Sequence, residues 1–284
     1  MYALFKQKIS LSGKSDSTLK VYASHLAKLA LHFGCMPTDV DVDQINDYLY
    51  LVQQQHDTPS DSYFKHTVYG LRFIYRMYDL KDKRIGLPSI KRDKTLPVVL
   101  SREEVKRLLI APQLLKHRIL LALLYGCGLR CFELRNLKLS DLDFDRKMLH
   151  VRQGKCRKDR YVPLCDLLIR GLKTYIEAEQ PQTWLFNGKP EGRAGGDLDS
   201  RYSQRGVQWA VRQAQKQAGV LKEMTVHTLR HTYATHLLED GLDIITIKDL
   251  LGHECIDTTM VYLHVAQSGR VKPFSPLEKL YAKK

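Results

Sequence analysis

The sequence has no long apolar run and no secretory leader. Its uncharged apolar stretches all fall short of the roughly 18 residues that a membrane-spanning helix requires. The first residues, MYALFKQKISLSGKSDS, lack the apolar centre and the small-residue cleavage site of a signal peptide. We therefore expect a globular, cytoplasmic protein with no membrane partner.

Cysteine is sparse and forms no recognisable framework. The six cysteines are scattered, and no two of them make a CxxC pair. This spacing argues against a zinc ribbon and against a small disulfide-stapled secreted domain. We expect reduced thiols at Cys35, Cys127, Cys131, Cys156, Cys165 and Cys255.

Acidic residues are in the minority. Lysine and arginine total 45 against 31 aspartates and glutamates, which gives a formal net charge of +14. An excess of this size favours a polyanionic partner, and nucleic acid is the first candidate. Composition alone is equally compatible with a basic protein that binds no nucleic acid.

The chain of 284 residues is long enough for two domains, and its patterns change near residue 90. Before that point, apolar residues at helical spacing predict three amphipathic helices, over 19–33, 45–52 and 63–78. The stretch from Lys81 to Pro97 is basic, contains prolines and has few periodic apolar positions, which is typical of a connector. We predict a helical domain over 1–88, a basic linker over 89–100 and a second domain over 101–284.

The second domain is predicted to be mostly helical with one small antiparallel sheet. Ser101 and Glu104 form a capping-box pattern before a helix that runs to about Ile110, and an apolar helix follows over 118–125. Residues 148–152 and 160–163 alternate like two short strands with a basic hairpin between them. The fold class of the whole chain is therefore mainly α, of the α+β type.

The segment TVHTLRHTYATHLLEDGLDIITIKDLLGHECIDTTMVYLH, residues 225–264, is the most informative. Its first helix carries His227 and Arg230 three residues apart, so the two side chains project from the same face. Gly241 ends this helix. A histidine and an arginine therefore lie together on the helix surface.

The rest of this segment predicts a second helix and the start of a third. A glycine ends the second helix, over 244–251, so His253 lies in the turn that follows. Asp257 or Thr258 can cap the third helix. This places Tyr262 little more than one turn into it.

Several of these segments resemble the tyrosine recombinases, which include Xer-type recombinases and phage and integron integrases. HTLRHTYATHLL, LLGH and TTMVYLHV are similar to the catalytic core of that family. LLYGCGLRCFELRNLKLSDLD is similar to its first arginine motif, and VRQGKCRKDRYVPL to its lysine-bearing β-hairpin. The resemblance is close over roughly 98–265, and the helical front segment matches the family's DNA-clamping N-terminal domain in type.

The resemblance implies an enzyme that cuts and rejoins DNA through a 3′-phosphotyrosine, without ATP, metal or other cofactor. It assigns Tyr262 as the nucleophile, and Arg130 and Arg230 as the pair that clamps the scissile phosphate. A guanidinium presents a rigid fork of donors and stays charged. Two of them suit the extra negative charge of a pentacoordinate phosphoryl transition state.

The remaining site residues follow from the same resemblance. His227 corresponds to the acid–base histidine, and His253 to the histidine that binds a non-bridging oxygen or helps to position the tyrosine. Glu133 corresponds to an acidic residue that orients the site. Lys155 matches the general acid that protonates the departing 5′ oxygen, and Lys158 is its nearest rival in the same loop.

The implied partners are double-stranded DNA at specific sites and further copies of this chain. We expect a monomer in solution and a tetramer on paired sites, and the tail after Val265 either docks onto a neighbouring subunit or frays. The candidates for DNA contact are Lys20, Lys65, Arg72, Arg76, Lys91, Arg92, Arg157, Lys158, Arg201, Arg205 and Arg212. Transposition, phage integration, dimer resolution and cassette capture are all compatible with these motifs.

Two other functions share the motifs. A type IB topoisomerase would use the same chemistry without pairing sites, and a regulator of the same fold would bind DNA without cutting it. The compact length and the Xer-like motifs favour the recombinase over the topoisomerase. The presence of every catalytic residue type favours an enzyme, although Cys127 and Cys156 stand where the resemblance leads us to expect small residues.

The clustered histidines do not favour a metal site. His227 and His231 lie four residues apart on a helix, but HExxH and a matching carboxylate are absent from the sequence. Arg230 would also put a permanent positive charge beside the cation. We expect no bound metal, and we expect His231 and His236 to pack or face DNA rather than to act in catalysis.

Overall fold

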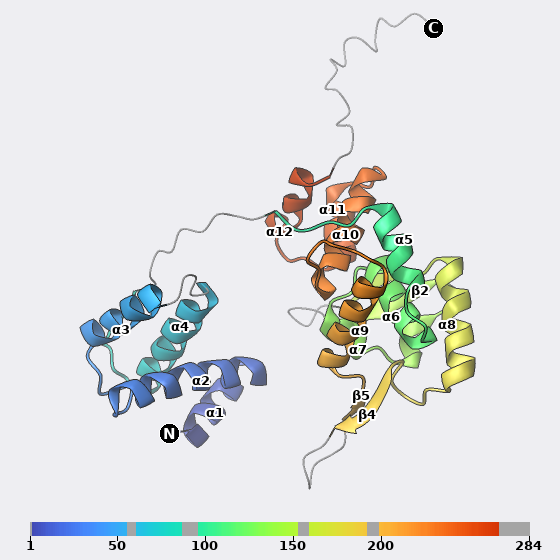
Figure 1. The fold of residues 1–284 in the computed structure, drawn as a ribbon. Coiled ribbons are helices and arrows are strands. Elements are labelled where there is room, and N and C mark those ends of the chain that lie inside the picture. Colours follow the sequence, from blue (N-terminus) through green and yellow to red (C-terminus); the bar gives the residue numbers. More distant parts are fainter. Residues whose placement is uncertain (1, 56–60, 87–95, 153–158, 192–198, 267–284) are drawn as a thin grey trace, which may run out of the picture. The chain divides into compact units, whose positions relative to one another are not determined.

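The chain divides into two compact units, residues 1–94 and 95–284. We describe them from a computed structural model that covers residues 2–55, 61–86, 96–152, 159–191 and 199–266 (Figure 1). The division falls inside the stretch for which the sequence predicts a linker. Within the described ranges, no helix is both long enough and apolar enough to cross a membrane.

All the regular secondary structure described in unit 1 is helical. Its elements are α1 (Tyr2–Leu11), α2 (Asp16–Phe33), α3 (Val42–Gln55) and α4 (Asp61–Met77). Ser15 caps α2 because its hydroxyl accepts a hydrogen bond from the N–H of Thr18, and Gly34 ends α2 in the left-handed conformation.

The core of unit 1 contains residues of all four helices, and α2 and α4 pack against each other through it. Buried residues recur on both helices at spacings of three and four: Leu19, Tyr22, Leu26, Leu29, Phe64, Val68, Leu71 and Ile74. The predicted helical bundle is confirmed. The sequence analysis missed α1, which adds only Phe5 and Ile9 to this core and so carries too short a pattern to be recognised.

Unit 2 contains two small antiparallel sheets among its helices. The first has the strand order β1 (Leu142–Asp143), β2 (Met148–Val151) and β3 (Arg160–Pro163), with Val151 paired to Arg160. The second pairs β4 (Asn187–Glu191) with β5 (Asp199–Arg201). The predicted strands β2 and β3 are confirmed, whereas β1 and the second sheet are too short or too polar to show an alternating pattern.

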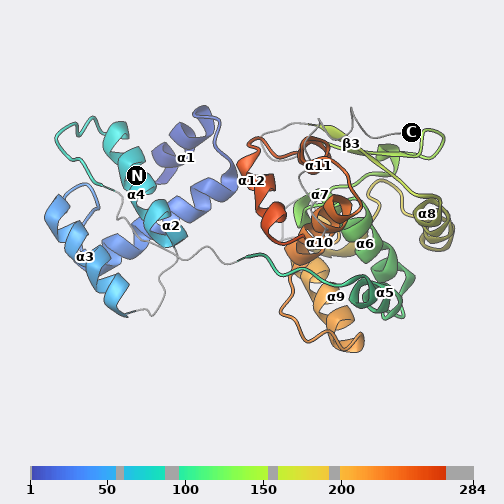
Figure 2. The same ribbon diagram turned by 90° about the horizontal axis from the view of Figure 1, so that it is seen from above.

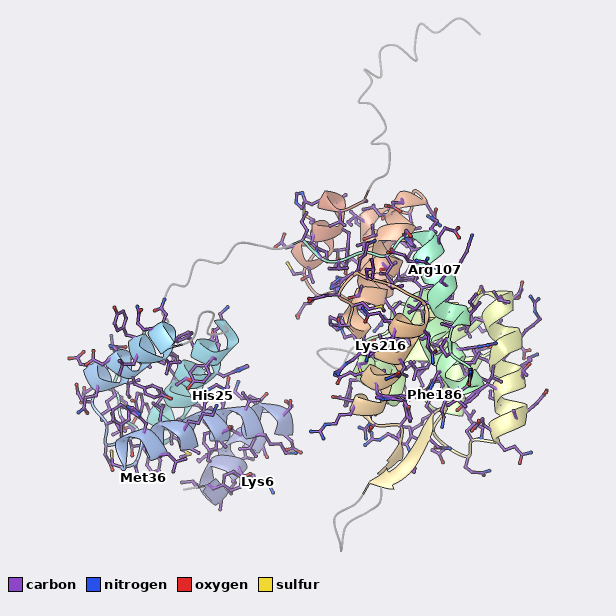
Figure 3. All side chains as sticks on the ribbon, in the orientation of Figure 1. Lys6, His25, Met36, Arg107, Phe186 and Lys216 are labelled. Atoms are coloured by element: carbon purple, nitrogen blue, oxygen red, sulfur yellow. The ribbon has the colours of Figure 1, made fainter. Side chains whose placement is uncertain are left out.

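The helices of unit 2 enclose one large hydrophobic core and a smaller buried cluster that contains Tyr233 and Tyr262. They are α5 (Arg102–Ile110), α6 (Leu115–Gly126), α7 (Cys131–Arg135), α8 (Asp166–Glu179), α9 (Gln204–Gln217), α10 (Val226–Glu239), α11 (Ile244–Leu251) and α12 (Asp257–Met260), with the 3₁₀ turns η1 (Leu139–Asp141) and η3 (Val261–His264). The predicted capping box is present, since Ser101 and Glu104 each accept a hydrogen bond from the other's backbone. Three residues of unit 2 are labelled in Figure 3: Arg107 and Lys216 are exposed, and Phe186 is buried.

Helix α10 is the central helix of unit 2. It packs against α6, α9, α11 and η3, and it lies among them when unit 2 is seen from above (Figure 2). Nine of its residues are buried, including Arg230 and His236. Leu100 is also tied to α10, because its N–H donates to Thr232 Oγ1 and its carbonyl lies 3.0 Å from His236 Nε2. Helix α10 is therefore packed on several sides and tied to the segment before α5.

The end of the described chain differs from the prediction. The sequence predicts one continuous third helix that contains Tyr262, but α12 stops at Met260 and Tyr262 lies in the 3₁₀ turn η3. Ile256, rather than Asp257 or Thr258, occupies the cap position. The predicted amphipathic tail after residue 266 lies outside the described residues.

Candidate active site

Glu133 anchors one side of the site. It lies in the first turn of α7, where it accepts hydrogen bonds from the backbone N–H of Arg130 at 2.8 Å and from Arg130 Nη1 at 2.7 Å. The Glu133 side chain is buried, which would by itself raise its pKa. Hydrogen bonds and charge from Arg160 and Arg130 outweigh the burial and lower the pKa of Glu133 to about 2.

Arg160 is a residue that the sequence analysis left out of the site. Arg160 lies at the start of β3 and forms two parallel hydrogen bonds to Glu133. Its Nη1 donates to Oε1 at 2.9 Å and its Nη2 to Oε2 at 2.8 Å. Its Nε donates to the carbonyl of Leu250 at the end of α11. Its only signal in the sequence is its place as the first residue of a predicted strand.

Arg230 is buried and held by backbone carbonyls. Its Nη1 donates to Gly128 and its Nη2 to Leu251, both at 2.6 Å, and it lies 3.8 Å from Glu133. Burial, and then the nearby charge of Arg130, lower the pKa of Arg230 to about 9. The structure therefore brings the two predicted arginines together around one carboxylate.

The two predicted histidines lie beside these arginines. His227 is exposed one turn before Arg230 on α10, and burial of part of the ring, followed by the charges of Arg230 and Arg130, lowers its pKa. His253 Nδ1 lies 2.9 Å from Thr259 Oγ1, and burial together with the same two arginines lowers its pKa to about 3. Both imidazoles are neutral at neutral pH.

Tyr262 is almost completely buried, with 1% of its surface exposed. Its phenol oxygen lies 3.0 Å from Nδ1 of His231. Burial raises the pKa of Tyr262, and the charges of Arg230 and Arg130 act in the opposite direction. The predicted nucleophile, both predicted arginines and both predicted histidines thus fall in one region of unit 2.

The sequence analysis expects His231 and His236 to pack or to face DNA. His236 is a packing residue, since its imidazole is buried between the hydroxyl of Tyr125 and the carbonyl of Leu100. His231, in contrast, is bonded to the predicted nucleophile. Among the described residues, no group of three or more histidines, cysteines or carboxylates is placed to hold a metal ion.

Several predicted residues lie outside the described ranges. Both candidates for the general acid, Lys155 and Lys158, fall between β2 and β3, together with Arg157. The linker residues Lys91 and Arg92 also fall outside. The described strand ends on either side of the hairpin are Val151 and Arg160, which are paired, and Arg160 reaches Glu133.

One face of α9 adjoins the predicted catalytic residue His227. Arg205, Gln208 and Arg212 are exposed at spacings of three and four, so they form a single stripe. A cavity of about 230 Å³ is lined by Gln208 and Arg212 of α9 and by His227 of α10. This surface therefore continues from the helix stripe to a predicted catalytic histidine.

The predicted basic residue Arg201 is engaged within the protein. Its guanidinium lies over the ring of Trp184, and its Nη1 donates to Asn136 Oδ1 at 2.7 Å. These contacts tie β5 to the end of α7.

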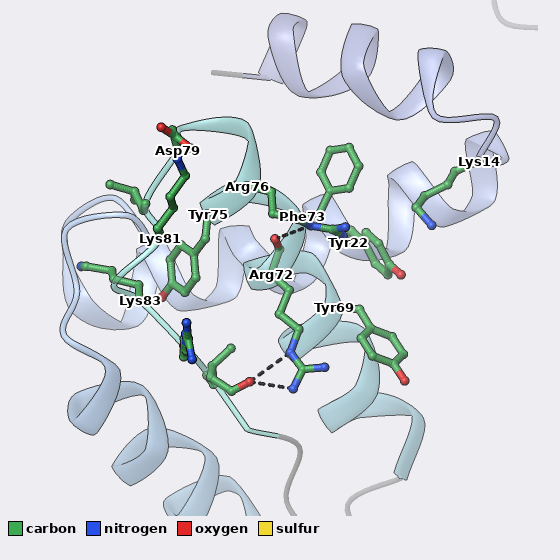
Figure 4. Close-up of a pocket in the computed structure, with 13 residues that line it drawn as sticks. Lys14, Tyr22, Tyr69, Arg72, Phe73, Tyr75, Arg76, Asp79, Lys81 and Lys83 are labelled. Carbon is green, nitrogen blue, oxygen red and sulfur yellow. Dashed lines mark hydrogen bonds and ion pairs between the residues drawn. The ribbon is translucent and has the colours of Figure 1, made fainter.

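Unit 1 carries a basic cavity of its own (Figure 4). Its volume is about 830 Å³, and Arg72 and Arg76 of α4 lie on its wall together with Lys14, Lys81, Lys83 and Arg84. Aromatic rings alternate with these cations. Arg72 donates twice to the carbonyl of Ile85, so it also fixes the chain that follows α4.

The other two predicted DNA contacts of unit 1 are Lys65 and Lys20. Lys65 lines a smaller cavity of about 310 Å³ that shares Tyr22 and Tyr69 with the basic cavity. Lys20 is exposed on α2.

A buried tyrosine, three arginines around one carboxylate and neutral histidines define a candidate phosphoryl-transfer site on a mainly helical fold. Comparison with known proteins agrees with this class. Residues 98–268 match the phage integrase family. The chain belongs to this family, that of the tyrosine recombinases.

The similarity extends along most of the chain. The chain is 36% identical over 263 residues to the tyrosine recombinase XerA of Thermococcus kodakarensis, and the match covers 92% of this chain and 89% of the relative. It is 32% identical over 280 residues to a tyrosine recombinase of Thermosipho africanus, covering 94% of each. In fold it resembles the XerH site-specific recombinase in a pre-cleavage complex with its difH substrate, with a TM-score of 0.70, 20% identity and coverage of 93% and 82%.

Proposed function

We propose that this chain cuts and rejoins double-stranded DNA at specific sites through a 3′-phosphotyrosine formed on Tyr262. The observation that carries the proposal is the position of the buried Tyr262 phenol, which lies close enough to Arg230 and Arg130 to feel their charges. Burial raises the pKa of Tyr262, and the two arginine charges oppose that rise. A phosphate drawn to the two guanidinium groups would come to the oxygen that attacks it.

The charge of the site suits a phosphate. Arg130, Arg160 and Arg230 contribute three positive charges around the single negative charge of Glu133. The nearby histidines are neutral, so the excess is about two positive charges in a mostly buried region. A scissile phosphodiester that becomes more negative as it is attacked would be stabilised there.

The reaction needs one bond formed and one broken at phosphorus. The Tyr262 oxygen bonds to phosphorus, the bond to the 5′ oxygen breaks, and the leaving oxygen takes a proton. We assign that proton to Lys155, on its resemblance to the family's general acid, with Lys158 as the alternative. The phosphotyrosine keeps the energy of the broken bond, so the 5′-hydroxyl of another strand can reverse the step without ATP.

Two basic surfaces suit DNA. In unit 2, Arg205, Gln208 and Arg212 carry the side chains that pair with guanine and adenine edges, and their stripe reaches the cavity at His227. In unit 1, the cavity at Arg72 and Arg76 offers several cations and aromatic faces to a phosphate backbone. We infer base reading for the first surface and backbone contact for the second.

Strand exchange between two sites requires more than one active site. We therefore propose a monomer in solution that assembles as a tetramer on paired DNA sites. The resemblance to the two recombinase relatives over more than nine-tenths of the chain supports a recombinase rather than a topoisomerase or a non-catalytic regulator.

A nicked suicide substrate tests the proposal. When the short fragment that bears the new 5′-hydroxyl diffuses away after cleavage, the unsubstituted protein should accumulate a covalent DNA adduct. Tyr262→Phe should bind the same DNA with unchanged affinity and form no adduct. Tyr233→Phe is the matched control, because Tyr233 belongs to the same buried cluster and should leave the adduct intact. An adduct of normal yield with Tyr262→Phe would overturn the proposal.

A further inference from the structure

His231 is the hydrogen-bond partner of the proposed nucleophile. It follows Arg230 directly on α10, and its Nδ1 lies 3.0 Å from the Tyr262 phenol oxygen, with the two ring centroids 5.8 Å apart. The contact links the central helix of unit 2 to the turn η3, thirty-one residues later in the chain. It joins a ring nitrogen to the atom that attacks phosphorus.

The protonation states on the two sides of this contact are complementary. Burial raises the pKa of Tyr262, so the phenol keeps its proton at neutral pH. Burial, and then the charges of His227 and Arg230, lower the pKa of His231 to about 4, so its imidazole is neutral. The phenol must therefore donate its proton to Nδ1, which carries the free electron pair, and the imidazole hydrogen must lie on Nε2.

The other groups around Tyr262 are poorly suited to take the proton. Arg130 and Arg230 act on the phenol as positive charges and have no electron pair to offer. His253 has its Nδ1 bonded to Thr259. Within the described residues, His231 alone is hydrogen-bonded to the phenol oxygen.

We propose that His231 is a catalytic residue, the base that accepts the Tyr262 proton as the phenol attacks phosphorus. This proposal rests on the proposed function. The O–H bond of Tyr262 breaks, an N–H bond forms at Nδ1, the oxygen bonds to phosphorus, and the phosphorus bond to the 5′ oxygen breaks. The leaving oxygen takes its proton from the general acid. In rejoining, the imidazolium returns its proton to Tyr262 as the phosphotyrosine bond breaks.

Timing makes this transfer feasible with a weakly basic imidazole. A phenol bonded to phosphorus holds its proton far less tightly than a free phenol, so the proton leaves as the bond forms. The bound phosphate also brings negative charge to the site, which stabilises the imidazolium. The ring centroid of the exposed His227 lies 5.9 Å from that of His231, so the proposed acceptor adjoins both an exposed ring and the buried phenol.

The test measures single-turnover cleavage of the suicide substrate by two variants. His231→Ala removes the acceptor, and His231→Asn keeps an amide oxygen near the place of Nδ1 that accepts the phenol hydrogen bond but takes no proton. We expect both variants to bind DNA normally and to cleave about 100-fold more slowly or worse. Cleavage by His231→Asn at the unsubstituted rate would reduce His231 to a positioning residue and overturn the proposal.

A second substrate separates this base from the general acid. When sulfur replaces the 5′ bridging oxygen, the leaving thiolate needs no proton, so Lys155→Ala should regain its rate. The His231 variants should stay slow on this substrate, because their defect lies in the nucleophile. Recovery of the His231 variants on the sulfur substrate would contradict the proposal. If a His231 variant cleaved either substrate faster than the unsubstituted protein, the proposal would also fail, because His231 would then be holding Tyr262 back.

His236→Asn is the matched control. His236 lies on the same helix and is also bonded through Nδ1 to a phenol, that of Tyr125, but it contacts no predicted catalytic group. At equal folded fraction, measured by circular dichroism, it should cleave at the unsubstituted rate. Absence of any adduct from the unsubstituted protein would refute the proposed function instead, so the two failures are distinguishable.

Discussion

At the scale of single residues, Glu133 determines how the positive charges of the site are held. A buried carboxylate is costly unless ionised partners and hydrogen bonds surround it, and Glu133 has both from Arg130 and Arg160. It lets three guanidinium groups approach one another in a region where they would otherwise repel. Because these bonds form only in the folded chain, Glu133 also contributes to the free energy of unfolding.

The pH dependence of unfolding should expose this role. The folded-state pKa of Glu133, about 2, lies below its value in the unfolded chain. Its stabilisation is therefore fully present above about pH 4.5 and is lost as the pH falls towards 2. Denaturant titrations should show Glu133→Gln to be less stable by on the order of 3 kcal/mol at pH 7, with a shallower fall in unfolding free energy between pH 5 and pH 2.

Glu103→Gln provides the comparison for that experiment. Glu103 forms an ion pair with Lys106 on the exposed surface of α5, and pairs of this kind contribute little to stability. Its pH profile should follow that of the unsubstituted protein. Parallel profiles for Glu133→Gln and the unsubstituted protein would contradict the account of Glu133.

At the scale of elements, the junction between α6 and α7 positions the arginines. Gly128 has a φ of +58°, and a Cβ there would come within 2.4 Å of the Tyr233 ring on α10. Its carbonyl also accepts the hydrogen bond from Arg230. Both the backbone conformation and the close packing of α10 therefore require glycine at this position.

Replacing Gly128 by alanine should destabilise unit 2 by about 2–5 kcal/mol, through backbone strain and the displaced ring together. Gly219→Ala is the matched control, because Gly219 has a φ of +62° but open space around the added methyl group. Thermal melts should show a clearly larger loss for Gly128→Ala, accompanied by lower cleavage activity. Equal losses in the two variants would show that packing against α10 contributes nothing.

The elements also show what the sequence can and cannot predict. The Ser101 capping box, α11 and the strands β2 and β3 were predictable because caps, glycine stops and alternation are local signals. The break between α12 and η3 was not, since tertiary packing rather than local preference buries Tyr262 there.

The residues of the candidate site likewise fall into those that the sequence predicts and those that it does not. The motifs predicted which of the described residues would gather, namely Arg130, Glu133, His227, Arg230, His253 and Tyr262. They did not reveal Arg160 or the contact of His231 with Tyr262, because both depend on side chains that are 27 and 31 residues apart in the chain. The orientations of the Arg160 guanidinium and the His231 imidazole are set by the tertiary fold, and no short motif encodes them.

At the scale of the whole molecule, the net charge of +14 favours binding to any DNA, and smaller surfaces must supply the choice of site. The cavity of unit 1 and the stripe on α9 should therefore behave differently when substituted. Backbone contacts depend steeply on salt, whereas base contacts depend on sequence.

Binding measured over a series of salt concentrations separates the two surfaces. Arg76→Gln should weaken binding to all sequences alike and reduce the slope of log K against log salt by about 0.9. Gln208→Ala should leave that slope unchanged and lower the preference for the cognate site by about 1–3 kcal/mol. Arg107→Gln removes one charge from the exposed surface of α5 and serves as the control, with neither effect expected. A change in site preference without a change in slope for Arg76→Gln would reverse our assignment of the unit 1 surface.

The central claim is that Tyr262, one of fifteen tyrosines, becomes covalently attached to DNA. The most direct test is to trap the adduct on the suicide substrate, digest both the protein and the DNA, and locate the nucleotide-bearing peptide by mass spectrometry. We predict a single modified residue, Tyr262, linked through a 3′-phosphate. A nucleotide attached to any other residue, or linked through a 5′-phosphate, would contradict the account.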